Sequence, residues 1–372
     1  MKKPAKIAIS VAAAAALVLG VLLVVFPLVT SKAAEARLGE FFTEAGIPEA
    51  MWSVDRAYYV PLLGHLVLEK LAFGESDNPF LEAKKVTLAL DTSRENFFAG
   101  SVDAREVSFL EDDTGLTIKS LSVNDFSVDT AQFGYAPVEA VKKLGKIRLN
   151  DAVFRQKGQT YFSLGRLSAD TGYAEGNIPL SSSVSLKDFV LNARQFTPRP
   201  AVRPEYRLSN LELKNSLSGG VYTVNLVIDG AQLFTIKVEL GLSLPQELLA
   251  SGDITSLALI DYEEDLKINS FAITYTDRSF LDHVFELAGM PGGRELAAEQ
   301  LNESILMLAM LGGVNAEQFA GEVMKFIAKP EKFELKTNIV SPVSFEEISE
   351  NPFALNVSLS VNGGKPFTTG EQ

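Results

Sequence analysis

Cysteine is absent from this chain of 372 residues. Its absence excludes disulfide bonds, thiolate nucleophiles and metal sites with sulfur ligands. A chain without thiols suits an oxidising compartment, where a stray thiol is a hazard. We therefore expect the fold to be held by ordinary burial of apolar side chains, for which a chain of this length is sufficient.

Histidine is scarce, with His65 and His283 the only two in the chain. A zinc site of the HExxH type is therefore impossible, and a Ser-His-Asp triad would have to use one of these two residues. Neither lies near a GxSxG signature, and the chain has no P-loop and no GxGxxG after a strand. We expect both histidines to be solvated or capping side chains. The sequence thus predicts a protein that is not an enzyme, with no catalytic, cofactor-binding or metal-binding residue and no cofactor.

Two pairs of adjacent acids are the remaining candidates for chemistry. Asp112-Asp113 and Glu263-Glu264 fall at or near expected turns, where solvated charge is the ordinary interpretation. A glycosidase pair stays open as an alternative, because its two carboxylates need not be close in sequence.

Positive charge is in deficit, with 34 Lys and Arg against 47 Asp and Glu and a net charge of -13. Proteins that bind nucleic acids gain much of their affinity by neutralising phosphates with clustered basic residues. The balance here excludes nucleic acid as an expected partner. It also disfavours tight docking on anionic lipid headgroups.

One long apolar run, Ile7–Val29, carries no charge and follows Lys2, Lys3 and Lys6. Because about 20 helical residues cross a bilayer core, this run predicts a single transmembrane helix, with Pro27 near its far end. The positive-inside rule then places the N-terminus in the cytoplasm and the bulk of the chain in the periplasm of a bacterium. The membrane is thus the first expected partner. A cleaved signal peptide is the alternative, with small residues between 31 and 36 as cleavage positions.

Alternating apolar and polar residues dominate the chain after position 50, which is typical of antiparallel strands with one buried face. Gly219-Gly220 joins two of these strands as a hairpin, and Asp112 to Gly115 forms another turn. The expected strands are Met51–Val60, His65–Phe73, Lys85–Asp91, Val102–Leu110, Leu116–Val123, Phe126–Val128, Tyr206–Lys214, Val221–Asp229, Ala231–Leu244, Lys332–Asn338 and Leu355–Val361.

A short pattern recurs in this region: apolar, any, apolar, any, Asp or Asn, apolar, any, apolar. Its polar member is in turn Asp125, Asp151, Asp188 and Asn210. Short polar side chains bond to nearby backbone and tolerate turn geometry, so we expect the strand to bend or shift its face there. A ladder of carboxylates that binds metal is the weaker alternative, because single acids on separate strands lack a converging partner.

Helical periodicity returns near the C-terminus. Ser279–Met290, capped by Ser279 or Asp277, is followed by Glu295–Leu311 and Asn315–Ala328, and Pro330 ends the last helix. The expected class is α+β, mainly antiparallel β, with an N-terminal transmembrane helix and a C-terminal helical insertion. The expected parts are a cytoplasmic tip and anchor (1–31), a juxtamembrane helix (32–50), a β-rich body (51–278), a helical segment (279–330) and C-terminal strands with a tail (331–372).

The stretch from Phe271 to Asp282, FAITYTDRSFLD, resembles the segment in which a strand runs into a helix near the C-terminal end of AsmA-like and related periplasmic proteins of Gram-negative bacteria. Residues 326 to 335, FIAKPEKFEL, followed by Pro342-Val343, are similar to a passage from helix to strand in the same proteins. The resemblance implies an inner-membrane protein whose body is an elongated, curved β-sheet.

The resemblance also implies a function in the cell envelope. We expect the protein to bind or shield lipid in lipid transport or envelope homeostasis, with a phospholipid as its ligand. The sequence does not specify lipid-binding residues. A scaffold or assembly factor for envelope proteins is the alternative, since the C-terminal helices and the lack of catalytic motifs suit a protein partner equally. An aliphatic inner sheet face would favour lipid, and a polar one would favour the scaffold.

Overall fold

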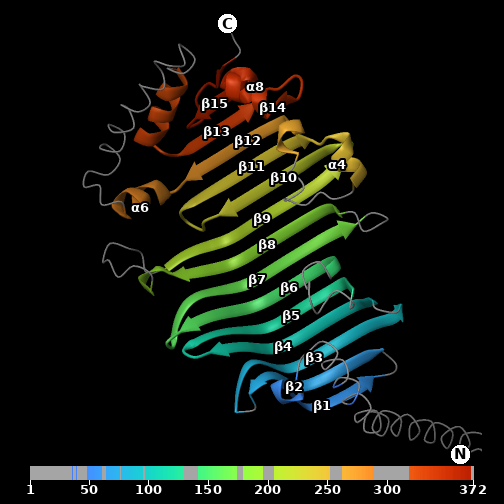
Figure 1. Ribbon diagram of the computed structural model, residues 1–372. Helices are drawn as coiled ribbons and strands as arrows, with labels where there is room; N and C mark the ends of the chain where they lie inside the picture. The colour runs from blue at the N-terminus through green and yellow to red at the C-terminus, as the bar shows by residue number, and fades with distance from the viewer. Residues whose placement is uncertain are drawn as a thin grey trace, which may run out of the picture. The chain divides into compact units, whose positions relative to one another are not determined.

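The computed structural model describes Ala36, Gly39 and residues 48–60, 64–75, 77–94, 97–129, 141–173, 179–195, 205–251, 262–287 and 318–369. The chain divides into two compact units, residues 1–159 and 160–372. In each unit long strands lie side by side in the order of the chain, as Figure 1 shows. This follows from the short connections, which join sequential strands as antiparallel hairpins.

The first unit contains six strands, and every neighbouring pair among them is antiparallel. The strands are β1 (Trp52–Val60), β2 (His65–Glu75), β3 (Asn78–Arg94), β4 (Phe97–Glu111), β5 (Thr114–Asp129) and β6 (Val141–Gln156), preceded by the short η1 (Glu49–Met51). Asp112 adopts a positive φ of 50° in the turn between β4 and β5, which confirms the turn predicted there.

The second unit continues the pattern and adds short helices. Its strands are β7 (Gln159–Tyr173), β8 (Pro179–Asn192), β9 (Glu205–Ser218), β10 (Val221–Asp229), β11 (Phe234–Ser243), β12 (Lys267–Asp277), β13 (Lys332–Thr337), β14 (Val343–Ser344), β15 (Val357–Val361) and β16 (Phe367–Thr368). Its helices include η3 (Ala193–Gln195), α4 (Gln246–Ser251), η4 (Glu263–Asp265), α6 (Phe280–Leu287), α8 (Phe345–Glu350) and η5 (Pro352–Leu355), and residues 318–328 are also helical. The hairpin of β9 and β10 turns at Gly219-Gly220, as predicted.

The expected class was α+β, mainly antiparallel β, with an N-terminal transmembrane helix, and the transmembrane helix in it is not supported. The structure is mainly antiparallel β, because its strands reach 17 residues whereas its described helices are few and short, for example α6 with 8 residues. None of the helices in the part of the chain that the structure describes is long and apolar enough to cross a bilayer. The run Ile7–Val29, from which the span was predicted, lies outside the described residues, as do most of the expected juxtamembrane helix and Glu295–Leu311.

Helix α6 begins where the sequence predicted a cap. The carboxylate of Asp277 accepts a hydrogen bond from the backbone N–H of Leu281 at 3.1 Å and another from the hydroxyl of Tyr275 at 2.6 Å. Asp277 is buried, so both bonds compensate the loss of water around its charge. The expected five-part division of the chain stays a prediction, since the two compact units do not test it.

Three of the four polar members of the recurring pattern adopt left-handed backbone, as expected for a shift of the strand, and the fourth does not. Asp125, Asp151 and Asp188 have φ of 57°, 50° and 54°, whereas Asn210 does not have a positive φ. Lys70 and Glu106, which the pattern missed because it required Asp or Asn, have φ of 51° and 50° in the same setting. Non-glycine residues are uncommon in this conformation. Its recurrence on several strands therefore marks a regular feature of the sheet and not a local irregularity.

In the first unit Lys70, Glu106 and Asp151 belong to one row that crosses every strand, which we call the kink row, whereas Asp125 lies outside it. On every strand one residue of this row is skipped in the pairing, and the residues before and after it pair in the same register. The strands therefore bend at the same place. The kink row consists of Asp55, Lys70, Lys84, Glu106, Lys119 and Asp151. Neighbours form ion pairs in twos, Lys70 with Asp55 at 2.5 Å, Lys84 with Glu106 at 2.8 Å and Lys119 with Asp151 at 3.1 Å.

Candidate functional site

The register of the first unit collects apolar side chains on one side of the sheet. Four rows of cross-strand neighbours, two on each side of the kink row, carry apolar or aromatic residues on every strand from β1 to β6. We call this set the apolar face of the first unit. Its rows are Trp52, Phe73, Leu81, Phe109, Leu116 and Phe154; Val54, Leu71, Ala83, Val107, Ile118 and Ala152; Ala57, Leu68, Val86, Ala104, Leu121 and Leu149; and Tyr59, Leu66, Leu88, Val102, Val123 and Ile147.

The reverse side of the same sheet is mostly polar, with Val67 as a buried exception. At the bend each strand presents two consecutive polar residues, one from the kink row and one from the row beside it, and then returns to apolar residues. The row beside the kink row is Arg56, Glu69, Lys85, Arg105, Ser120 and Asn150. The sheet is therefore amphipathic across its thickness, even though strict alternation fails in every strand.

Burial shows which way this sheet bends. The two apolar rows that flank the kink row hold its most buried side chains, for example Leu68 at 1% exposure and Ala83 at 3%. The outermost rows are more open, since Phe109 is 38% exposed and Tyr59 is 40% exposed. The charged side chains of Lys70 and its neighbours in the kink row are instead mostly solvated. Because side chains crowd together inside a bend, we infer that the apolar face lies on the inner side.

The second unit has an apolar face of its own. Two rows of cross-strand neighbours carry apolar or aromatic residues across β7 to β13 and on to β15. We call these rows the apolar face of the second unit. The rows are Ala169, Val184, Leu213, Leu226, Val238, Ile273, Leu335 and Leu359; and Leu167, Leu186, Leu211, Ile228, Ile236, Tyr275, Phe333 and Val361.

Helices cover part of this second face. Phe326 of helix 318–328 packs with Leu359 and Val361, and Tyr275 and Phe333 surround that cluster. The rings of Tyr275 and Phe326 meet edge to face, with centroids 5.8 Å apart. This end of the face is thus an ordinary protein core.

A second buried cluster packs α4 against the sheet. Leu248 of this helix is fully buried among Leu242, Leu244 and Leu266. Both clusters lie toward the C-terminal strands of the unit.

Toward β7 the second face is more open. None of the nine residues of β10 is buried and none is fully exposed, so both sides of this strand are partly accessible. Leu213 and Leu226 in the middle of the face have the same intermediate exposure and belong to neither packed cluster. The described residues therefore leave partly accessible apolar surface over β8 to β10.

Polar groups are rare within these faces. On β7 to β9 the row next to the apolar face of the second unit carries Thr171, Ser182 and Asn215. Asn215 donates a hydrogen bond to the hydroxyl of Ser182 at 3.2 Å, so the polar groups bond to each other. Ser182 and Asn215 thus form a small polar patch beside the apolar face of the second unit.

The residues that sequence analysis weighed for chemistry do not converge. His65 begins β2 in the first unit, whereas His283 lies on α6 in the second. Asp112 and Asp113 lie in a turn, and Glu263 and Glu264 lie in η4. Within the described ranges, no group of three or more His, Asp or Glu side chains could hold a metal ion.

Among the described residues, Tyr275 has the largest pKa shift. Burial raises the pKa of its hydroxyl, and the hydrogen bond to the Asp277 carboxylate raises it further. This pair caps α6 and packs against Phe326, and these contacts of the fold account for the shift. The described apolar rows have the chemistry to receive an apolar ligand.

Sequence reasoning did not specify ligand-contacting residues. The register adds candidate positions, because it shows which apolar residues are neighbours across strands. The signal available in the sequence was the succession apolar, polar, polar, apolar within a strand, as in Leu68 to Leu71 and Ala104 to Val107.

Comparison with known families gives one match, a family described as "Uncharacterized protein", which covers residues 227–362. The matched stretch runs from β10 to β15 and so includes the covered end of the second apolar face. No curated protein matches the chain.

Proposed function

We propose that this protein binds or shields the acyl chains of a phospholipid on its apolar sheet faces, and that its role is binding and not catalysis. The observation that carries the proposal is the apolar face of the first unit, where every cross-strand neighbour in four rows from β1 to β6 is apolar or aromatic.

The chemistry of that face favours an acyl chain over a protein surface. Protein interfaces carry roughly one hydrogen bond per 100–200 Å², so a face that receives a protein normally offers polar groups. Here the only side-chain polar atoms belong to Trp52 and Tyr59, both on β1. An acyl chain requires no such groups and gains about 0.8 kcal/mol for each buried methylene.

The proposal also includes the cellular location of the protein. The resemblance of residues 271–282 and 326–335 to AsmA-like proteins supports a place in the bacterial envelope, where phospholipids must be moved or shielded from water. The absence of cysteine suits the periplasm.

The test is native mass spectrometry with lipid extraction, on the full chain purified without detergent. We expect stoichiometric phospholipid in the wild type. Leu226→Glu places a charge on the open part of the second apolar face and is expected to lower lipid occupancy at least fivefold. Val227→Glu is the matched control, because it lies one residue along β10, has the same intermediate exposure and points to the opposite side.

A lipid-free wild type, with no transfer of fluorescent phospholipid between vesicles, would overturn the proposal. Equal losses in the two variants would do the same, since a general effect on folding and not the apolar face would then explain them. A stable protein partner recovered by crosslinking from a lipid-free chain would support the scaffold instead.

A further inference from the structure

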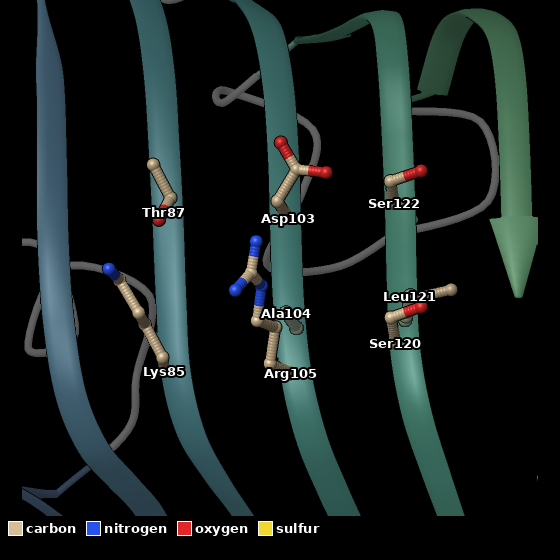
Figure 2. Close-up of a pocket in the computed structure, with 8 residues that line it drawn as sticks. All are labelled: Lys85, Thr87, Asp103, Ala104, Arg105, Ser120, Leu121 and Ser122. Carbon is tan, nitrogen blue, oxygen red and sulfur yellow. The ribbon is translucent and has the colours of Figure 1, made fainter. Parts of the chain in front are cut away.

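The polar side of the first sheet contains a pocket of about 400 Å³. Its lining comes from three neighbouring strands, β3, β4 and β5, and Figure 2 shows the side chains. The lining residues are Lys85, Thr87, Asp103, Ala104, Arg105, Ser120, Leu121 and Ser122. The polar ones belong to two rows of cross-strand neighbours on the side of the sheet away from the apolar face.

Two cations lie directly opposite each other in this pocket. Lys85 of β3 is the cross-strand partner of Arg105 of β4. Like charges in this position repel, which makes the pair unfavourable unless an anion lies between them. In Figure 2 the Arg105 guanidinium reaches toward β3, whereas the Lys85 side chain leans away from it.

Neither cation is neutralised by an ion pair within the described part of the chain. Glu69, which faces Lys85 from β2, accepts a hydrogen bond from the Tyr58 hydroxyl at 3.3 Å. The neighbouring cations of the kink row differ, since Lys84 is paired with Glu106.

Hydroxyl groups complete the lining. Ser120 lies opposite Arg105 on β5, and Thr87 and Ser122 flank Asp103 in the next row. The Ser120 oxygen accepts a hydrogen bond from the Asn150 side chain at 2.9 Å, so its own proton is available to a ligand. Two cations with hydroxyl donors beside them form a set suited to a tetrahedral oxyanion.

Asp103 limits what this site can hold. Its carboxylate leaves a single net positive charge among the lining side chains, in a chain with a net charge of -13. A polyanion would meet strong repulsion, whereas one small oxyanion can be held by short-range contacts.

We propose that this pocket binds one phosphate group between Lys85 and Arg105. The group is either free inorganic phosphate or the headgroup phosphate of a lipid. The polar side chains of this site are separate from the acyl-chain surface, because they and the apolar face lie on opposite sides of one sheet.

The experiment is a titration of the full chain with inorganic phosphate at constant ionic strength, followed by calorimetry and by the NMR signals of the Arg105 guanidinium. We expect saturable binding that chloride does not reproduce. Lys85→Gln and Arg105→Gln are each expected to weaken it at least tenfold. Lys84→Gln removes the same charge one residue along β3, outside the pocket, and is expected to change affinity less than twofold.

Equal weakening by Lys84→Gln would overturn the proposal, because net charge and not the pocket would then determine binding. A wild type without saturable binding, or with guanidinium signals that do not move, would overturn it as well. The NMR measurement on the wild type decides the matter if the glutamine variants fail to fold.

Sedimentation with phosphatidylglycerol vesicles identifies the source of the phosphate. Loss of vesicle binding in Lys85→Gln and Arg105→Gln, but not in Lys84→Gln, would support a lipid headgroup. Loss of phosphate binding without any change in vesicle binding would support the free ion.

Discussion

At the scale of single residues, left-handed backbone is the feature on which the sheet geometry depends. Asp and Asn tolerate this conformation because their short side chains bond to the local backbone, and that tolerance made Asp125, Asp151 and Asp188 visible in the sequence. Lys70 and Glu106 have no such advantage. Their conformation is imposed by the neighbouring strands, which is why residue type alone did not predict them.

Asp188→Val is expected to be less stable than Asp188→Gly by about 1–2 kcal/mol, because a β-branched side chain collides with the backbone at positive φ whereas glycine does not. Urea denaturation of both variants measures the difference. A valine variant as stable as the glycine variant would mean that Asp188 is not held at φ 54° in solution.

Gly145 faces Asp125 across β5 and β6, and an added Cβ would lie 2.8 Å from the Asp125 Cβ. Gly145→Ala is therefore expected to destabilise the protein by about 1–3 kcal/mol, as overpacking typically does. Gly321→Ala is the control, because nothing lies within 4 Å of its added Cβ and it belongs to helix 318–328. That substitution should be neutral or stabilising by up to about 1 kcal/mol, and equal losses in the two variants would contradict the expectation.

At the scale of the elements, sequence periodicity predicted strands well and their lengths poorly. Leu116–Val123 and Phe126–Val128 were expected as two strands, yet the structure has one, β5. The alternation breaks at Asp125 because the backbone turns left-handed there while pairing with β6 continues on both sides. A local pattern cannot reveal pairing that continues across a break, because that depends on the neighbouring strand.

The cap of α6 gives an element-scale prediction about pH. The pKa of Tyr275 is raised in the folded protein above its ordinary value of 10.0, so the folded state keeps this proton where the unfolded state loses it. The resulting stabilisation is fully present below pH 10 and is lost as the pH rises above it.

We expect the wild type to lose stability between pH 10 and 12, and Tyr275→Phe to lose less over the same range. Each group that titrates in this way contributes up to about 1.4 kcal/mol per pH unit. Chemical denaturation at several pH values, with Tyr206→Phe as a comparison at a tyrosine away from this cap, measures the difference. Parallel curves for wild type and Tyr275→Phe would contradict the expectation.

At the scale of the whole molecule, two amphipathic sheet units present apolar surface that the described helices cover only near the C-terminal strands. Composition and alternation predicted a β-rich chain, and that prediction is confirmed. They could not predict that the apolar positions of six strands form common rows, because register depends on pairings between residues far apart in the chain.

Exposed apolar patches beyond a few hundred Å² promote association in soluble proteins. We expect the lipid-free full chain to self-associate with increasing concentration, and to return to its smallest species when a short-chain phospholipid is added. Analytical ultracentrifugation follows both changes. A lipid-free chain that stays monomeric at every concentration would indicate that these faces are not open in solution.

The kink row has a consequence for insertions and deletions. On β2 the residues from Leu66 to Phe73 read apolar, apolar, apolar, Glu, Lys, apolar, apolar, apolar, and removal of Lys70 alone leaves a strand in which Leu66, Leu68, Leu71 and Phe73 alternate without a break. The same holds on each of the other five strands for its own member of the row. Six single-residue deletions would thus remove the bend at the kink row while the apolar side chains of the four rows kept their side. The residues of the kink row determine the bend of this sheet, and the residues of the four apolar rows determine the polarity of its two sides.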